Sequence, residues 1–226
     1  MKLRHEHKFL VEYDDYMRIR HSLTKVMNLD KNSIDNKGYH IRSVYFDDIY
    51  ENALYEKLSG ISERKKYRVR IYNFSDNRIK LEIKKKFQDF TNKIGTDINK
   101  EEYYRLYNGD INDYAFSDNL VKRSYYIETR NNLLRPKVIV DYYREAFTLP
   151  YNEVRITFDL ELEAVKPQKD IFSDSMITHK LPPMYSRILE VKYNNFLPTH
   201  IKSILEPYNL TRLSVSKFLL CRDIIQ

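Results

Sequence analysis

The sequence predicts an α+β fold in which an antiparallel, closed β-barrel of about eight strands is surrounded by helices packed on its outside. Three observations predict this class. At least five segments alternate charged and apolar residues with a period of two, which is typical of strands. Segments with helical periodicity lie between them. The chain has 226 residues, only four glycines and seven prolines, and no linker-like stretch, which predicts a single domain that spans residues 1–226.

The clearest strands form a hairpin over residues 65–86 with one cationic and one apolar face. The cationic face carries Lys66, Arg68, Arg70 and Tyr72 on the first strand and Lys80, Glu82, Lys84 and Lys86 on the second. The apolar face carries Tyr67, Val69, Ile71, Leu81 and Ile83. Residues 73–77 are predicted to form the turn. A strand with one face in water alternates in the same way, so this hairpin alone also fits a solvated surface.

The other elements follow in order. Strands are predicted at 3–11, 39–47, 136–144, 153–163 and 187–193, and helices at 14–27, 49–58, 100–108, 118–131, 199–206 and 211–225. Asn99 and Glu102 are spaced as a capping box before the helix at 100–108, and Gly109 ends that helix. The segment 153–163 alternates without a break. Residues 87–98 are predicted to be a polar connection, and 170–183 a loop.

Composition limits the function classes. A net charge of +7 indicates an anionic ligand, such as nucleic acid, phosphate or an acidic surface. The lone Cys221 excludes an intrachain disulfide and a cysteine-rich zinc site, and its apolar neighbours predict a buried, inert thiol. The first residues lack the apolar core of a signal peptide, and no apolar run reaches the ~20 residues of a spanning helix. We therefore expect a cytoplasmic location.

Charged strand faces of both signs recur along the chain. If the apolar faces pack outward against helices, the charged faces meet around a narrow interior, although an open sheet with one face in water would show the same pattern. So many enclosed cations would be costly unless they are hydrated or matched by an anion, and a chain of phosphates fits. Arginine offers phosphate a fork of donors and lysine a compact charge. No glycine-rich phosphate loop is present, so side chains would have to hold any nucleotide.

Carboxylates interrupt the cationic rows. Their hard oxygen ligands suit Mg²⁺ or Mn²⁺, ions that also bridge phosphates. The candidates are Glu6, Glu82, Asp159, Glu161 and Glu190. His5 and His7, two residues apart on one strand face, are a weaker metal alternative, because no further histidine or cysteine lies near them in the sequence.

A family resemblance extends across almost the whole chain. It is carried by Arg4-His5-Glu6-His7-Lys8-Phe9, Ser43-Val44-Tyr45-Phe46-Asp47, Tyr67-Arg68-Val69-Arg70-Ile71-Tyr72, Leu81-Glu82-Ile83-Lys84-Lys85-Lys86, Tyr142-Tyr143-Arg144-Glu145-Ala146-Phe147, Ile188-Leu189-Glu190-Val191-Lys192-Tyr193 and Ser214-Val215-Ser216-Lys217-Phe218. With these segments in this order, the chain resembles the VTC catalytic domain of polyphosphate polymerases, a branch of the CYTH triphosphate tunnel superfamily.

The resemblance implies roles for individual residues. Phosphate contacts are implied for Lys8, Arg68, Arg70, Lys84, Arg144 and Lys217, and Glu190 would help to hold the metal. Lys86 stands where eukaryotic relatives carry a histidine, and Lys93 lies in the segment that supplies a further lysine. Tyr142 is placed to stack near a nucleotide base. We add Lys66 and Lys192 as phosphate-binding candidates and Glu6 and Glu82 as metal candidates, and we expect Arg68, Arg70, Lys84 and Arg144 to be catalytic.

The function implied is transfer of the γ-phosphoryl of ATP to a growing polyphosphate chain, with Mn²⁺ or Mg²⁺ as cofactor. The expected partners are ATP and inorganic polyphosphate, without nucleic acid; a membrane partner that exports the product stays open. The superfamily's Glu-x-Glu-x-Lys pattern is Arg4-x-Glu6-x-Lys8 here, which weakens the alternative of a tunnel triphosphatase. A non-catalytic polyphosphate- or nucleotide-binding module and a nucleic-acid-binding protein are the remaining alternatives.

Overall fold

The computed structural model describes residues 4–34, 37–87, 90–214 and 216–225. Two compact units divide the chain, and each is assembled from three separate segments. The first unit takes its described residues from Met1–His40, Tyr142–Glu163 and Lys180–Lys217, and the second from Ile41–Asp141, Ala164–His179 and Phe218–Gln226. That the whole chain acts as one domain stays a prediction.

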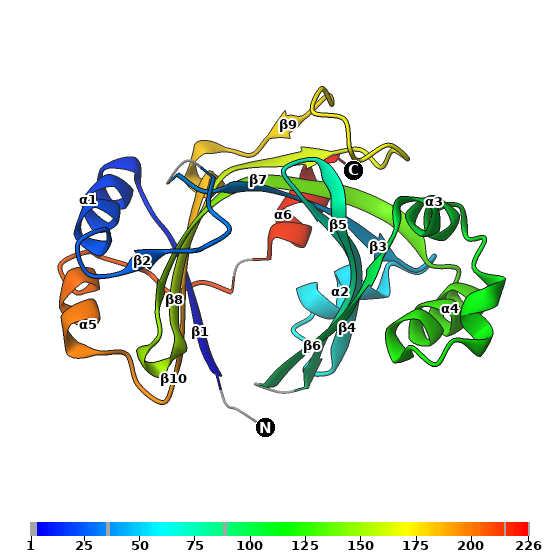
Figure 1. The fold of residues 1–226 in the computed structure, drawn as a ribbon, viewed down its shortest axis with the longest axis horizontal. Coiled ribbons are helices and arrows are strands. Elements are labelled where there is room, and N and C mark those ends of the chain that lie inside the picture. The colour runs from blue at the N-terminus through cyan, green and yellow to red at the C-terminus, as the bar shows by residue number, and fades with distance from the viewer. Residues whose placement is uncertain (1–3, 35–36, 88–89, 215, 226) are drawn as a thin grey trace. The chain divides into compact units, whose positions relative to one another are not determined.

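The strands form one hydrogen-bonded sheet (Figure 1). They are β1 (Arg4–Leu10), β2 (Asn28–Leu29), β3 (Tyr39–Asp47), β4 (Arg64–Tyr72), β5 (Ser75–Phe87), β6 (Phe90–Ile98), β7 (Arg135–Leu149), β8 (Val154–Val165), β9 (His179–Lys180) and β10 (Arg187–Asn194). Their order is β1-β10-β8-β7-β3-β4-β5-β6, with β2 on β7 and β9 on β8. The α+β class with an antiparallel sheet is confirmed.

The prediction that this sheet closes into a barrel, however, was wrong. In the part of the chain that the structure describes, the path of paired strands runs from β1 to β6 and no pairing joins these two ends. The outer edge of β1 shows the physical reason. The backbone N–H of Leu213 donates to the carbonyl oxygen of Lys8 at 2.9 Å, and Phe9 forms a bridge with Arg212. The chain's own later segment therefore takes up edge groups of β1 that a closing strand would need.

In the first unit, helices α1 (Tyr13–Leu23) and α5 (Thr199–Leu205) cover the apolar face of β8 and β10 (Figure 1). Ile19 and Leu23 of α1 are fully buried against this face. The strands contribute Val154, Ile156, Phe158, Leu189 and Val191 to the same core. Because alternate residues point to opposite faces, the intervening residues of β8 and β10 lie on the other face of the sheet.

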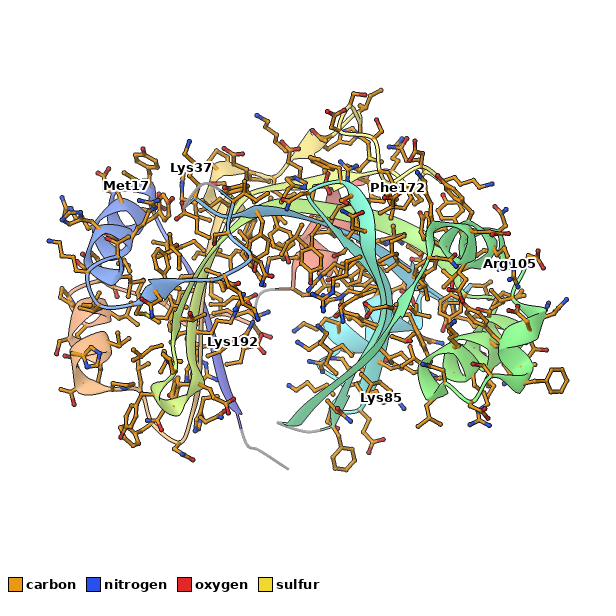
Figure 2. All side chains as sticks on the ribbon, viewed as in Figure 1. Met17, Lys37, Lys85, Arg105, Phe172 and Lys192 are labelled. Carbon is orange, nitrogen blue, oxygen red and sulfur yellow. The ribbon has the colours of Figure 1, made fainter. Side chains whose placement is uncertain are left out.

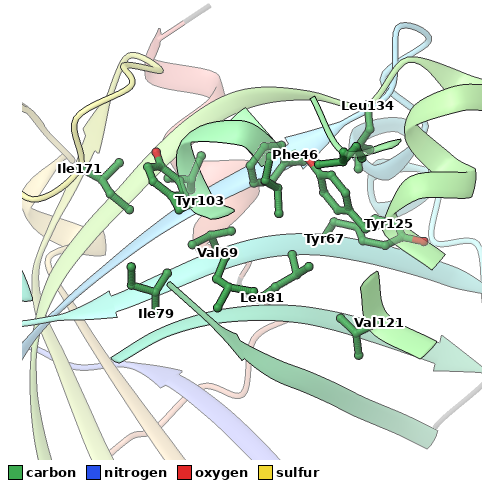
Figure 3. Packing of buried hydrophobic residues seen from close by; sticks show 14 of the residues in the cluster. Phe46, Tyr67, Val69, Ile79, Leu81, Tyr103, Val121, Tyr125, Leu134 and Ile171 are labelled. Atoms are coloured by element: carbon green, nitrogen blue, oxygen red, sulfur yellow. The ribbon is translucent and has the colours of Figure 1, made fainter. Parts of the chain in front are cut away.

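The second unit has its own core on the apolar face of the hairpin β4–β5 (Figure 3). Its helices are α2 (Asn52–Leu58), α3 (Lys100–Asn108), α4 (Leu120–Asn132) and α6 (Lys217–Ile225), the last beginning at the unit boundary. Tyr103 of α3 and Tyr125 of α4 pack with Tyr67, Val69 and Leu81 of the hairpin. A short 3₁₀ turn of this unit lies at Asn112–Phe116, and those at Tyr151–Glu153 and Pro183–Tyr185 belong to the first unit.

The ends of α3 are as predicted. The Asn99 side chain accepts from the N–H of Glu102 at 2.8 Å, and the N–H of Asn99 donates to the Glu102 carboxylate at 3.1 Å, which completes the capping box. Gly109 ends the helix in the left-handed region at φ 81°.

Two predictions about local structure were wrong. The hairpin turn is only two residues long, because Asn73 and Phe74 both adopt positive φ, and β5 already begins at Ser75. The supposed polar connection contains the nine-residue strand β6, which pairs with β5. Its weak hydrophobicity reflects its place at the end of the sheet. The strand predicted at 153–163 is confirmed as β8, although Glu161 within it has φ 53°; β8 pairs with β10 up to Leu160 and also pairs with β9.

The last predicted helix also differs, since α6 begins only at Lys217 and the chain before it runs along β1. Cys221 is buried in α6, as expected. Among the described helices, none combines the length and apolar character that crossing a bilayer requires.

Candidate functional site

The charged face of the first unit centres on Glu190 of β10, a carboxylate that is only 3% exposed. Two lysines contact it closely: Lys192 donates to it at 2.6 Å and Lys217 at 2.9 Å. Lys8 of β1 lies at 3.4 Å and Arg144 of β7 at 3.8 Å. Four predicted phosphate-binding cations of this unit thus converge on one carboxylate.

Asp159 of β8 is the second buried carboxylate of this group and has no exposed surface. It accepts from the guanidinium of Arg144 and forms an ion pair with Lys217. Lys217 is therefore shared between Asp159 and Glu190. We call Lys8, Arg144, Asp159, Glu190, Lys192 and Lys217 the Glu190 cluster.

The register of the strands explains this convergence. Lys8 of β1 and Thr157 of β8 both stand directly opposite Glu190, and Glu6 stands opposite Lys192. Paired residues share a face of the sheet, and residues two apart on one strand do so as well. The sequence alternation that buries Phe158 and Leu189 beneath the helices therefore places these polar residues together on the opposite face.

The electrostatics of the Glu190 cluster favour full ionisation. Burial by itself would raise the pKa of Glu190, but Lys192, Lys217 and Lys8 hold it well below the usual range. Burial opposes the charge of Lys217 too, yet Asp159 and Glu190 raise its pKa above that of a free lysine. For Lys192 burial is the stronger effect, and its pKa is lowered. The cluster is a dense array of fixed charges of both signs.

Tyr142 of β7, predicted to stack near a base, is 3% exposed. The Arg144 guanidinium lies 5.3 Å, and the Lys217 ammonium 5.0 Å, from the centre of its ring. These cation–π contacts support two cations of the cluster. Base stacking by Tyr142 stays a prediction.

The second unit has a separate charged group around Glu82 of β5, which is 1% exposed. The Nε of Arg68 donates to Glu82 at 2.6 Å, a guanidinium nitrogen of Arg70 lies 3.9 Å away, and Lys93 of β6 forms a further ion pair. Burial would raise the pKa of Glu82, but these three cations lower it to about 2. We call Arg68, Arg70, Glu82 and Lys93 the Glu82 cluster.

Two side chains of β3 orient the arginines of the Glu82 cluster. Arg70 Nε donates to the hydroxyl of Ser43 at 3.2 Å, and Arg68 donates to the hydroxyl of Tyr45 at 3.0 Å. In the register of β3 and β4, Ser43 stands directly opposite Arg70, and Tyr45 stands directly opposite Arg68. Alternation in the sequence predicts no role for Ser43 or Tyr45, because it does not show which strands pair.

A row of lysines lies beside the Glu82 cluster. The register places Lys84 of β5 between Lys66 of β4 and Lys93 of β6. Two residues further along β5, Lys86 stands opposite Arg64 of β4. Like charges placed directly across a sheet repel, so an anion would stabilise this row. Burial, with Lys57 and Arg64 nearby, lowers the pKa of Lys66 to about 7. Its ammonium lies 4.2 Å from the centre of the Phe218 ring.

The metal candidates divide between the units. Glu190 and Glu6 lie in the first unit, where Glu6 contacts Lys8 at 3.4 Å, and Glu82 lies in the second. The described residues contain no group of three or more acidic, histidine or cysteine side chains arranged to hold a metal. Glu190 and Asp159 do, however, share one ammonium, and two carboxylates completed by phosphate oxygens suit Mg²⁺ or Mn²⁺. These residues fit a metal bound together with a phosphate ligand.

Three comparisons place the chain among known proteins. The family model described as the VTC domain matches residues 3–225, which confirms the resemblance found in the sequence. No curated protein matches the chain.

The solved structures that match are distant in sequence. A "putative adenylate cyclase" from Bacillus halodurans has 13% identity and a TM-score of 0.55, with 95% of this chain and 94% of that chain covered. A second "putative adenylate cyclase", from Vibrio parahaemolyticus, has 12% identity, a TM-score of 0.48 and coverage of 95% of each chain. A conserved hypothetical protein from Pyrococcus furiosus has 11% identity and a TM-score of 0.43, with 91% and 87% covered. At such identities only the first likeness is informative, and it concerns the fold alone.

Proposed function

Because the chain belongs to the VTC domain family, we propose that it is an ATP-dependent polyphosphate polymerase. A terminal phosphate oxygen of the polyphosphate chain attacks the γ-phosphorus of ATP. The bond between this phosphorus and the oxygen that bridges it to the β-phosphate breaks, and ADP leaves with that oxygen. One phosphoanhydride bond forms as another breaks. The partners are ATP and inorganic polyphosphate, and the supply of ATP favours the cytoplasm.

The observation that carries the proposal is the convergence of Lys8, Arg144, Lys192 and Lys217 on Glu190. In the Glu190 cluster four cations face two carboxylates, and in the Glu82 cluster three face one. A linear polyanion complements such an excess of fixed positive charge.

The residues supply what phosphoryl transfer requires, which is in-line positioning and stabilisation of charge. Arg68, Arg70 and Arg144 each present a planar fork to phosphate oxygens, while the lysines add compact charges along the chain. Glu190, Asp159 and Glu82 gather these cations on the strand faces before the ligand arrives.

A divalent ion, when bound, would neutralise part of the phosphate charge and orient the transferring group. Glu190 and Asp159 are the carboxylates that would hold it, with Glu6 nearby on β1. Glu82 of the second unit is a further carboxylate candidate, and like Glu190 it is engaged by cations in the free protein.

The test is to incubate the pure protein with ATP and Mn²⁺ and to measure acid-insoluble polymer, ADP and free phosphate together. We expect polymer and ADP in step, with little free phosphate. Release of phosphate without polymer would identify a triphosphatase instead. Binding of polyphosphate without ADP release under any divalent metal would identify a non-catalytic module.

A further inference from the structure

Thr157 of β8 carries a buried hydroxyl whose role the proposed reaction does not yet explain. The residue has no exposed surface, and its Oγ1 has no hydrogen-bond partner among the described residues. Buried hydroxyls are usually paired, because leaving one unpaired costs free energy. The register places Thr157 directly opposite Glu190, on the same face of the sheet and two residues from Asp159.

Glu190 has little need of another donor as the structure stands. Lys217 and Lys8 contact its Oε1 at 2.9 and 3.4 Å, and Lys192 and Arg144 contact its Oε2 at 2.6 and 3.8 Å. These cations are also the proposed phosphate ligands of this unit. A phosphate chain that binds them competes with Glu190 for their donors.

We propose that Thr157 is a positioning residue, which donates its hydroxyl to Glu190 when a phosphate chain draws the lysines away. The inference rests on the proposed function, because it requires a phosphate chain at the Glu190 cluster. Thr157 itself has no exposed surface for a ligand to contact, so it acts through Glu190. Rotation of its side chain about χ1 and of its O–H bond can redirect the donor without moving the strand.

The physical need arises from the burial of Glu190. A buried carboxylate that loses its cations without replacement is strongly destabilised, and this cost would weaken phosphate binding. A hydrogen bond from Thr157 offsets part of the cost and keeps the carboxylate oriented beneath the cations. Thr157 thus lets the lysines exchange Glu190 for phosphate.

Thr157→Val tests the proposal, because valine keeps the branched shape and removes the hydroxyl. Binding of tripolyphosphate is measured by calorimetry with a chelator present, so that no divalent metal takes over Glu190. We expect affinity about tenfold weaker than wild type, the worth of one hydrogen bond to a charged group. The melting temperature of the free protein should be unchanged or higher, since the hydroxyl removed is unpaired. Thr157→Ser should retain most of the wild-type affinity.

Tyr103→Phe is the matched control. Tyr103 has a buried hydroxyl that is likewise unpaired among the described residues, but it lies in the apolar core of the second unit. Its removal should leave both the melting temperature and the affinity at or above the wild-type values. An affinity loss equal to that of Thr157→Val would mean that any buried hydroxyl has this effect, and would overturn the proposal.

A double-mutant cycle tests whether Thr157 acts through Glu190. In a Glu190→Gln background, adding Thr157→Val should change the affinity less than about twofold, because the carboxylate that Thr157 is proposed to stabilise is gone. Equal binding by wild type and Thr157→Val, or a lower melting temperature of free Thr157→Val, would overturn this inference alone. Failure of the wild type to bind tripolyphosphate would overturn the proposed function with it.

Discussion

Arg70 is a proposed phosphate ligand whose side chain is held in place by its neighbours. It is 7% exposed, its Nε is held by Ser43, and its guanidinium faces Glu82. Arg70→Ala should slow ATP-dependent polymer formation about 10²-fold, because it removes a donor fixed toward developing charge. Arg78→Ala is the control: Arg78 lies on β5 with a side chain that is 59% exposed, and its removal should leave the rate unchanged. Full activity of Arg70→Ala would refute its catalytic role.

Lys66 should make phosphate binding depend on pH near neutrality. With a pKa of about 7 its amine is mostly neutral above that pH and charged below it, and an anion binds the charged form. The affinity for tripolyphosphate should therefore rise as pH falls from about 8.5 to about 6, with about 1 kcal/mol due to Lys66. Lys66→Arg stays charged throughout this range, so the same titration should give it a flatter profile. Parallel profiles would contradict the assignment.

Glu82 should stabilise the folded protein above pH 4.5 and lose this contribution in acid. Its folded pKa of about 2 lies below the ordinary 4.5, so its contribution is fully present above pH 4.5 and is lost as pH falls toward 2. The contribution is on the order of 3 kcal/mol. Denaturant midpoints of wild type and Glu82→Gln, compared at neutral and acidic pH, measure it. The wild type should lose more stability than the variant, and equal losses would argue against this role.

At the scale of elements, a glycine sets the position of β7. Gly38, immediately before β3, has φ 158°, and a Cβ there would lie 2.3 Å from the carbonyl oxygen of Arg144. Gly38→Ala should cost at least ~2 kcal/mol of stability and weaken phosphate binding, because the backbone carrying Arg144 must move. Gly60 has φ 71°, and a Cβ added there would have no atom within 4 Å. Gly60→Ala should therefore lose less stability than Gly38→Ala and should bind phosphate normally. Thermal melts and calorimetry on both variants decide this.

Strand pairing, more than any single strand, assembles the charged groups. Alternation in the sequence identified the charged faces of β4, β5, β8 and β10, and it grouped Arg68 with Arg70 and Glu190 with Lys192. It could not pair Lys84 with Lys93, because β6 was mistaken for a connection. Strands at the end of a sheet bury little apolar surface, so their hydrophobic signal is weak.

At the scale of the whole molecule, the charge of +7 raises the question of nucleic acid. Apart from Lys217 of α6, the cations of the Glu190 and Glu82 clusters lie on strand faces, where carboxylates hold them. Such a face does not match the groove of a duplex as a basic helix does. A gel-shift assay with duplex and single-stranded DNA at about 0.15 M salt should show no complex, whereas tripolyphosphate binds. A stable shift under these conditions would favour the nucleic-acid alternative.

The sequence by itself determined the antiparallel α+β class, the family, the capped helix α3 and the residues of most charged faces, because these depend on local periodicity and on ordered motifs. Only the tertiary structure decided that Asp159 and Glu190 share Lys217 and that Ser43 and Tyr45 orient two arginines. It also decided that, in the described part of the chain, the end strands β1 and β6 do not pair with each other. Periodicity reports which face a side chain occupies. Which strands lie side by side, and what occupies their edges, depends on contacts between residues far apart in the chain.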